Sequence, residues 1–305
     1  MRAQAELPFF SVLGRRFYLG DEAAALEWLL APSRSPRAVC VANVHTLVSS
    51  LWDKELAMAQ ESAALSLPDG RPLSLAGKLL GAWEARQLRG PDLMLSAAKA
   101  GAARGTRHYF YGGAAGVAEA VAAKLKGLVP GLKVAGAESP PFSPLSDAGL
   151  KALAARLKRA KADILWVGLG APKQEKLMLR LARLKAPCAM AGVGAAFDYY
   201  AGTKNEAPRW MMGLALEWLY RLISEPRRLW KRYLGTNPLF VALLFSEHFG
   251  LYQGSAQSWP ERLLRLACLP PFLGALEQGR PWAALAALLM PAWLGRLFRL
   301  FVPGS

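Results

Sequence analysis

Cysteine and histidine are scarce in this 305-residue chain, which contains three of each. Cys40, Cys188 and Cys268 lie far apart, and no pair has C-x-x-C spacing. This scarcity argues against a disulfide framework and against a zinc site built from cysteine and histidine. Cys40 and Cys188 lie in apolar runs, so we interpret them as small buried core residues.

Acidic residues are also in short supply. The chain has 22 Asp and Glu against 38 Lys and Arg, which gives a net charge of +16 and a pI of about 10.1. A hydrophobic content of 53% with 20% charged residues excludes global disorder. The excess positive charge favours an anionic partner, which includes nucleic acid, phosphorylated substrates and an anionic membrane surface.

The sequence has no uninterrupted apolar segment of the kind that spans a bilayer. The longest candidate, residues 282–302, is broken by Pro291 and divided by Arg296 and Arg299, with Trp293 and Phe298 among them. This pattern favours an interfacial amphipathic segment, with a packed helical hairpin as the alternative. The N-terminus lacks the compact apolar region and cleavage site of a signal peptide, so we expect a cytoplasmic protein.

Short β-rich runs alternate with helical stretches between residues 38 and 200, as in βαβ units. We expect strands at 38–42, 108–111, 132–135, 164–167 and 188–193, and helices at 45–61, 92–103, 116–128, 148–161 and 174–184. This order predicts an α/β fold: a Rossmann-like parallel sheet flanked by helices, with a helical, amphipathic C-terminal appendage. We place a catalytic domain at 1–204, a basic aromatic helical appendage that completes the active site at 205–236, and an apolar membrane-associating extension at 237–305.

Polar and glycine residues follow four of the five expected strands. These residues are Asn43 and Thr46 after the first strand, Gly112 and Gly113 after the second, Gly170 after the fourth, and Asp198 after the fifth. The carboxyl ends of parallel strands lie at one edge of a sheet, where ligands of such folds bind. The sequence therefore predicts a binding site at this edge.

The segment from residue 167 to residue 175 is the most informative of these turns. A Gly-Leu-Gly turn follows an apolar run and leads into Lys173, Gln174 and Glu175. Such a turn points backbone N–H groups at a nucleotide beyond the strand end, although a lone glycine pair is often only a tight turn. The Gln174 amide can donate to and accept from a uracil, ribose or sugar hydroxyl, whereas Glu175 also fits a purely structural role at a helix start.

A basic and aromatic segment follows between residues 217 and 233. Arg221, Arg228 and Arg232 would share one face of a continuous helix, at i, i+7 and i+11. Pro226 favours instead two helices, with Ser224 or Glu225 capping the second. The arginines are candidates for binding an anionic substrate, with a solvated basic face as the alternative.

Taken together, these segments resemble the WecG/TagA/CpsF family of glycosyltransferases. The resemblance covers about residues 38–235 and rests on Ala42-Asn43, Leu67-Pro-Asp-Gly70, Gly90-Pro-Asp-Leu93, Tyr111-Gly-Gly113, Val129-Pro-Gly-Leu132, Gly168-Leu-Gly-Ala-Pro-Lys-Gln-Glu175, Gly192-Val-Gly-Ala-Ala-Phe-Asp198, Ala201-Gly202, Ala207-Pro208, Glu217-Trp-Leu-Tyr-Arg-Leu222, Glu225-Pro226 and Arg232-Tyr233. It implies an inverting transfer of a sugar from a UDP-sugar donor to a polyprenyl-diphosphate-linked sugar acceptor. It also implies a place at the inner face of the cytoplasmic membrane, where a cell-surface polymer is built.

The resemblance places Asp69 as the general base that takes the proton of the acceptor hydroxyl. We expect Asp69 to lie in a loop after a helix. The alternative to the role as base is that Pro68-Asp69-Gly70 is simply a turn. No Asp-x-Asp dyad occurs in the chain, so we expect no metal cofactor. Lys173, Arg221, Arg228, Arg232 and the turn amides would then stabilise the departing diphosphate.

Three positions depart from the family pattern. Val41 stands where a threonine is frequent, Gln87 where an arginine precedes the Gly-x-Asp-Leu motif, and Glu206 where an arginine precedes Ala-Pro. We expect these changes to affect the identity of the sugar and the acceptor more than the type of reaction.

Two other functions compete with this one. A dinucleotide-dependent oxidoreductase would need a complete glycine fingerprint at the first βα turn, which here reads Ala42-Asn-Val-His-Thr46. A basic Rossmann-like protein that binds membranes or nucleic acid without transferase activity would need its charge on one face, yet the basic residues are scattered. We therefore expect no nucleic-acid partner, and the sequence is compatible with a homo-oligomer.

Overall fold

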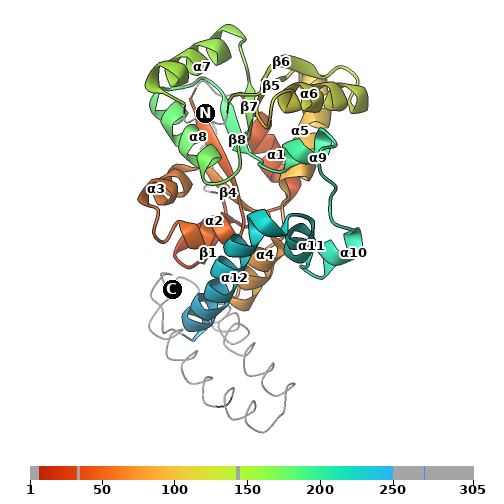
Figure 1. Cartoon of the computed structure of the whole chain (residues 1–305). Helices are drawn as coiled ribbons and strands as arrows, with labels where there is room; N and C mark the ends of the chain where they lie inside the picture. Colours follow the sequence, from red (N-terminus) through yellow and green to blue (C-terminus); the bar gives the residue numbers. More distant parts are fainter. Residues whose placement is uncertain (1–6, 33–34, 142–144, 250–270, 272–305) are drawn as a thin grey trace.

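The computed structural model describes residues 7–32, 35–141, 145–249 and 271. Its centre is a six-stranded parallel sheet with strand order β4-β3-β8-β7-β5-β6 (Figure 1). The strands are β3 (Arg37–Ala42), β4 (Leu65–Pro68), β5 (Arg107–Gly112), β6 (Lys133–Glu138), β7 (Ile164–Gly168) and β8 (Ala189–Gly192). The predicted Rossmann-like fold is confirmed.

Helices cover both faces of this sheet because its central strands are apolar on both sides. One face packs against α1 (Glu22–Leu30), α5 (Gly90–Arg104), α6 (Val117–Leu128) and α9 (Ala196–Tyr200). The other face packs against α7 (Asp147–Arg159) and α8 (Lys173–Arg183), with α3 (Lys54–Ser62) against α8. Trp166 and Phe110 are fully buried in the first core, which fixes the centre of the sheet.

A third core joins the two ends of the described chain. It contains the hairpin β1 (Phe9–Val12) and β2 (Arg15–Tyr18), α2 (Val44–Ser49), α4 (Arg71–Leu79) and α12 (Pro226–His248). Figure 1 shows α12 running past α2 and α4. At its far end, Glu247 Oε2 accepts a hydrogen bond of 2.8 Å from the backbone N–H of Leu13.

The structure corrects the prediction of one helix over residues 45–61. The chain forms α2 and α3 instead, because the Asp53 side chain accepts from the N–H of Leu56 at 3.0 Å and so begins a new helix. Strand β4 and the β1–β2 hairpin, which we did not predict, complete the fold on this side.

The C-terminal segment forms two helices after α10 (Arg209–Gly213), namely α11 (Glu217–Ser224) and α12, as Pro226 indicated. The expected boundary between residues 236 and 237 falls inside α12, which continues with Phe240 buried in the third core. Within the described ranges, no helix has both the length and the apolar character needed to cross a membrane. The candidate segment at residues 282–302 lies outside them.

Candidate active site

A cleft of about 770 Å³ lies at the carboxyl edge of the sheet. Its floor is made by the strand ends predicted to meet there, and its roof by α11 and α12. Lining residues include Asn43, Asp69, Gly113, Gly170, Lys173, Gln174, Asp198, Arg221, Arg228 and Arg232. Ten of the twelve predicted site residues therefore meet in one cavity, the exceptions being Thr46 and Gly112.

Asp69 lies at the end of β4, and not in a loop after a helix as we expected from the sequence. Its backbone is held from two sides, because its N–H donates to Ala42 O at 2.9 Å and Gln87 Nε2 donates to its carbonyl at 2.6 Å. Its Oδ1 accepts from the N–H of Gly90 at 3.1 Å. The carboxylate is thus fixed in position at the cleft wall while remaining partly accessible.

The pKa of Asp69 is raised to about 6, mainly by burial and also by the negative charge of Glu217. The hydrogen bond from Gly90 and the charges of Arg89 and Arg221 act in the opposite direction. A carboxyl group that ionises close to neutral pH is a stronger proton acceptor than an ordinary aspartate. Asp69 is therefore suited to general-base chemistry.

The three predicted arginines reach the same cleft although they lie on two helices. Arg221 comes from α11, whereas Arg228 and Arg232 come from α12, which begins after the break at Glu225. Arg228 is largely neutralised, since its Nε and its Nη2 donate to the Glu225 carboxylate at 2.6 and 2.8 Å.

Arg232 differs from Arg228 in having no ion pair within the described part of the chain. Its Nη2 donates to Asn43 Oδ1 at 3.4 Å. Burial lowers the pKa of Arg232 to about 10, which shows that its cation is poorly compensated. An anionic group bound in the cleft would supply the missing negative charge.

Lys173 and Gln174 begin α8 at different depths. Lys173 is exposed at the cleft, as expected for contact with an anion. Gln174 is only 3% exposed, and its Nε2 donates to Glu175 Oε1 at 3.0 Å. Burial raises the pKa of Glu175 to about 7, in keeping with the structural role that we left open for it.

Asp198 links two parts of the cleft wall. It forms an ion pair with Lys204 at 2.7 Å, and Lys204 also lies 3.4 Å from Glu225 at the start of α12. Lys204 thus connects Asp198, which follows β8, to the first residue of the helix region that carries Arg228 and Arg232.

Thr46 and Gly112 support the cleft from behind. Thr46 is buried, and its hydroxyl accepts from the N–H of Asn43 at 2.8 Å while the Asn43 side chain caps α2 in return. Gly112 has φ +143°, and a Cβ there would lie 2.5 Å from the backbone of Gly168. Both residues position the neighbours that line the cleft.

The lining residues that sequence reasoning missed include Glu217, Tyr199 and Arg89. The i, i+4 spacing of Glu217 and Arg221 on one helix face was the available signal for the first. Arg89 pairs with Glu206 at 2.9 Å and with Asp92 at 3.3 Å. Glu206, one of the departures from the family pattern, thus faces a cleft arginine.

Metal ligands are not grouped in the part of the chain that the structure describes, where no three His, Cys, Asp or Glu side chains could hold an ion together. The charged groups at the cleft roof are three arginines, Arg221, Arg228 and Arg232, with the carboxylates of Glu217 and Glu225 among them.

A parallel sheet that carries a carboxylate suited to proton transfer at its carboxyl edge, in one cleft with Arg221 and Arg232, which form no ion pair among the described residues, is typical of an enzyme that acts on a phosphorylated donor and a hydroxyl acceptor. The chain belongs to the glycosyl transferase WecG/TagA/CpsF family, whose model matches residues 10–254. It is thus a glycosyltransferase, as the sequence motifs indicated.

Curated relatives agree with this assignment. The chain is 28% identical over 209 residues to the N-acetylglucosaminyldiphosphoundecaprenol N-acetyl-beta-D-mannosaminyltransferase of Bacillus subtilis, which covers 68% of this chain and 79% of the relative. It is 30% identical over 212 residues to the enzyme of the same name from Bacillus spizizenii, with the same coverage.

Proposed function

We propose that this enzyme transfers a sugar from a UDP-sugar to a sugar carried on a polyprenyl diphosphate, with inversion at the anomeric carbon. The names of the relatives support an N-acetylglucosaminyl diphospholipid as acceptor and N-acetylmannosamine as transferred sugar. The observation that carries the proposal is that Asp69, at the end of β4, lines the same cleft as Arg221 on α11 and Arg232 on α12.

The proposed step follows from the presence of a carboxylate and two arginines in one cleft. Asp69 takes the proton of the acceptor hydroxyl as that oxygen bonds to the anomeric carbon of the donor. The bond from that carbon to the UDP oxygen breaks, and the leaving diphosphate takes the electron pair. Arg221 and Arg232, with Lys173 and the turn amides, would stabilise the negative charge that develops there.

A donor and acceptor screen tests the proposal directly. The full chain is incubated with a polyprenyl diphosphate N-acetylglucosamine acceptor and separate UDP-sugars, and the product mass is measured. A mass increase of one sugar residue with release of UDP is expected. Absence of product with every donor, from folded protein that binds UDP, would contradict it.

Activity is expected to fall as the pH drops through about 6, because protonated Asp69 cannot accept the acceptor proton. The measurement is kcat/KM between pH 4.5 and 8. Glu217→Gln removes a charge that raises the pKa of Asp69, so kcat/KM of this variant is expected to fall at a lower pH than that of the wild type. A fall at the same pH in both proteins would contradict the assignment of this pH dependence to Asp69.

The reaction is expected to need no divalent metal, because cationic side chains would supply the charge stabilisation at the diphosphate. Protein treated with a chelator and then dialysed should keep its UDP affinity and its turnover. Loss of activity that Mg²⁺ or Mn²⁺ restores would show that a metal contributes.

We further propose that the enzyme docks on the inner face of the cytoplasmic membrane, where a lipid-linked acceptor is confined. The outer side of α10–α12 supports this, because it carries an apolar and basic stripe: Trp210, Leu214, Ile223, Arg227, Trp230, Lys231, Leu234 and Val241, all exposed. Apolar insertion and attraction to anionic lipid would act together there, each basic residue contributing about 1 kcal/mol. The cleft arginines lie on the same helices, so docking would bring the acceptor to the site.

Substituting Trp230 and Leu234 by glutamate is expected to abolish binding to anionic liposomes while UDP affinity is kept. Both side chains are well exposed, at 47% and 61%, so the fold should tolerate the change. Liposome co-sedimentation measures it, with Leu75→Glu on α4 as an equally exposed control. Undiminished liposome binding would contradict docking through this stripe. Deleting residues 237–305 is a poorer test, because it also removes buried Phe240 and Glu247.

A further inference from the structure

Arg89 is an arginine of the cleft wall to which the proposed transfer reaction assigns no role. It precedes Gly90, whose N–H donates to Asp69 Oδ1 at 3.1 Å, so Arg89 is close to the proposed base. Burial dominates the raised pKa of Asp69, and the positive charge of Arg89 works against it. None of the ion pairs among the described residues joins Arg89 to Asp69, although opposite charges so placed attract each other.

Two other carboxylates hold the Arg89 guanidinium. Its Nη2 donates to Glu206 Oε2 at 2.9 Å, and its Nη1 donates to the two oxygens of Asp92 at 3.3 and 3.4 Å. Burial alone would lower the pKa of Arg89, but the hydrogen bond to Glu206 and the charges of Asp92 and Glu217 hold this pKa above its usual value. Glu206 is the stronger partner, because its contact is shorter and its side chain is less exposed, at 38% against 56% for Asp92.

Glu206 lies on a segment that is itself anchored, between α9 and α10. Its neighbour Ala207 is buried, and two residues earlier Lys204 pairs with Asp198 at 2.7 Å. An ion pair between two freely moving surface side chains contributes little, because ordering both of them costs entropy. That cost is reduced here, since the segment is held in place and the Arg89 side chain is only 15% exposed.

We propose that Glu206 is a positioning residue, which holds the Arg89 guanidinium away from the Asp69 carboxylate and so leaves that carboxylate free for the acceptor hydroxyl. The inference rests on the proposed role of Asp69 as base. Without Glu206, the longer and more exposed contact to Asp92 would not retain the guanidinium, and Arg89 would pair with Asp69. A carboxylate in such a pair is a weaker base, because the adjacent positive charge favours its ionised form.

The same reasoning accounts for one departure from the family pattern. Glu206 stands where an arginine commonly precedes Ala-Pro. A cation at this position would repel Arg89 and push it toward Asp69. The glutamate at position 206 is therefore matched to the arginine at position 89 in this chain.

The other ionisable groups that influence the pKa of Asp69, in the part of the chain that the structure describes, come from α9 and α11. Glu217 raises this pKa and Arg221 lowers it, both from α11. Burial raises the pKa of Tyr199 on α9 to about 12, so Tyr199 stays protonated between pH 4.5 and 8. These groups are unchanged in the variants below, so a difference between the variants reports on Arg89 and Glu206.

The pH dependence of four full-length proteins tests the inference: wild type, Glu206→Ala, Arg89→Ala and the double variant. In Glu206→Ala the freed Arg89 lowers the pKa of Asp69, so kcat/KM is expected to fall at a pH about one unit lower than in the wild type, with about tenfold lower turnover at pH 7. Arg89→Ala removes the cation, so kcat/KM should fall at a higher pH, and adding Glu206→Ala should change nothing further. No shift in Glu206→Ala, or an equal shift with and without Arg89, would overturn the inference.

The Gly90 amide reports on Asp69 without catalysis, because its N–H donates to the carboxylate. Labelling with ¹³C-arginine and ¹⁵N-glycine selects glycines that follow an arginine, which are Gly90 and Gly105, and only the Gly90 signal should stop titrating in Asp69→Asn. Its midpoint is expected at a lower pH in Glu206→Ala than in the wild type. An unchanged midpoint would overturn the inference, whereas a shifted midpoint with an unchanged pH profile of kcat/KM would contradict Asp69 as base and support the positioning by Glu206.

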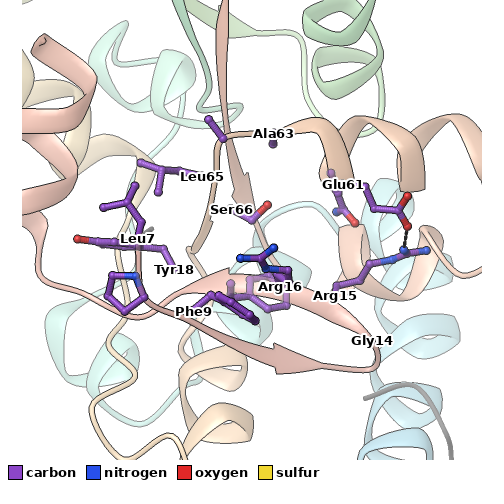
Figure 2. Close-up of a pocket in the computed structure, with 14 residues that line it drawn as sticks. Leu7, Phe9, Gly14, Arg15, Arg16, Tyr18, Glu61, Ala63, Leu65 and Ser66 are labelled. Carbon is purple, nitrogen blue, oxygen red and sulfur yellow. Dashed lines mark hydrogen bonds and ion pairs between the residues drawn. The ribbon is translucent and has the colours of Figure 1, made fainter. Parts of the chain in front are cut away.

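Glu61→Ala is the matched control. Glu61 pairs with Arg15 beside a second cavity of about 380 Å³, between the β1–β2 hairpin and the end of α3 (Figure 2). This cavity shares no lining residue with the catalytic cleft, and the Arg15 side chain is 18% exposed, much like that of Arg89. Glu61→Ala should keep the wild-type pH profile. The same shift as in Glu206→Ala would show a general effect of lost negative charge and would overturn the inference.

Discussion

Replacing Asp69 with asparagine is expected to lower turnover by about 100-fold or more while UDP affinity stays near that of the wild type. Asparagine has nearly the same shape, and its Oδ1 can still accept from the Gly90 N–H that now donates to Asp69 at 3.1 Å. The contacts to Ala42 and Gln87 are made by the backbone of residue 69 and survive the change. Only the ability to take a proton is lost.

Product formation under saturating donor and acceptor measures this effect, and calorimetric titration with UDP measures binding. Asp92→Asn is the matched control, because Asp92 is an exposed carboxylate on α5 whose partner is Arg89. It should stay close to wild-type turnover. A folded Asp69→Asn protein with near-normal turnover would contradict the role of Asp69 as base.

Replacing Arg232 with alanine is expected to lower turnover by about 100-fold, and replacing Arg228 by less than tenfold. Removal of one preorganised donor to a developing negative charge costs about 10²–10³ in rate. Arg232 has no ion pair among the described residues and is poorly compensated in its buried site, whereas Arg228 already pairs with Glu225. Of these two arginines, Arg232 is therefore the one whose positive charge is available to the substrate.

UDP affinity should also weaken in Arg232→Ala, because the diphosphate would bind to the same cation. Arg232→Lys restores the charge without the planar fork and is expected to recover part of the turnover. A larger loss in Arg228→Ala than in Arg232→Ala would contradict this ranking.

The sheet could be predicted from sequence because its central strands are short apolar runs that alternate with helical stretches. β4 escaped prediction, since Leu65–Pro68 is only four residues long and ends in Pro-Asp-Gly, which favours a turn wherever it occurs. The prediction of one helix over 45–61 was wrong for a similar local reason. Asp53 caps the N-terminus of α3 and so separates it from α2.

The part of the candidate site that lies at the strand ends was predictable, because the topology of a parallel sheet alone determines it. Residues that follow parallel strands must meet at one edge, and so the positions of Asn43, Gly170 and Asp198 followed from strand assignment. Contacts across the fold were not predictable in this way. Arg232 reaches Asn43 across 189 residues of sequence, and Arg89 meets Glu206 across 117, through packing that no local pattern encodes.

The hydrogen bond between Leu13 and Glu247 bears on the order in which the enzyme becomes active during synthesis. The ribosome makes the hairpin of β1 and β2 first and α12 last among the described elements, yet the two pack together in one core. A nascent chain that ends before residue 221 holds the whole sheet and Asp69 but lacks Arg221, Arg228 and Arg232 at the cleft roof. If these arginines act as proposed, we expect sugar transfer to begin only after α12 has left the ribosome and packed against the β1–β2 hairpin.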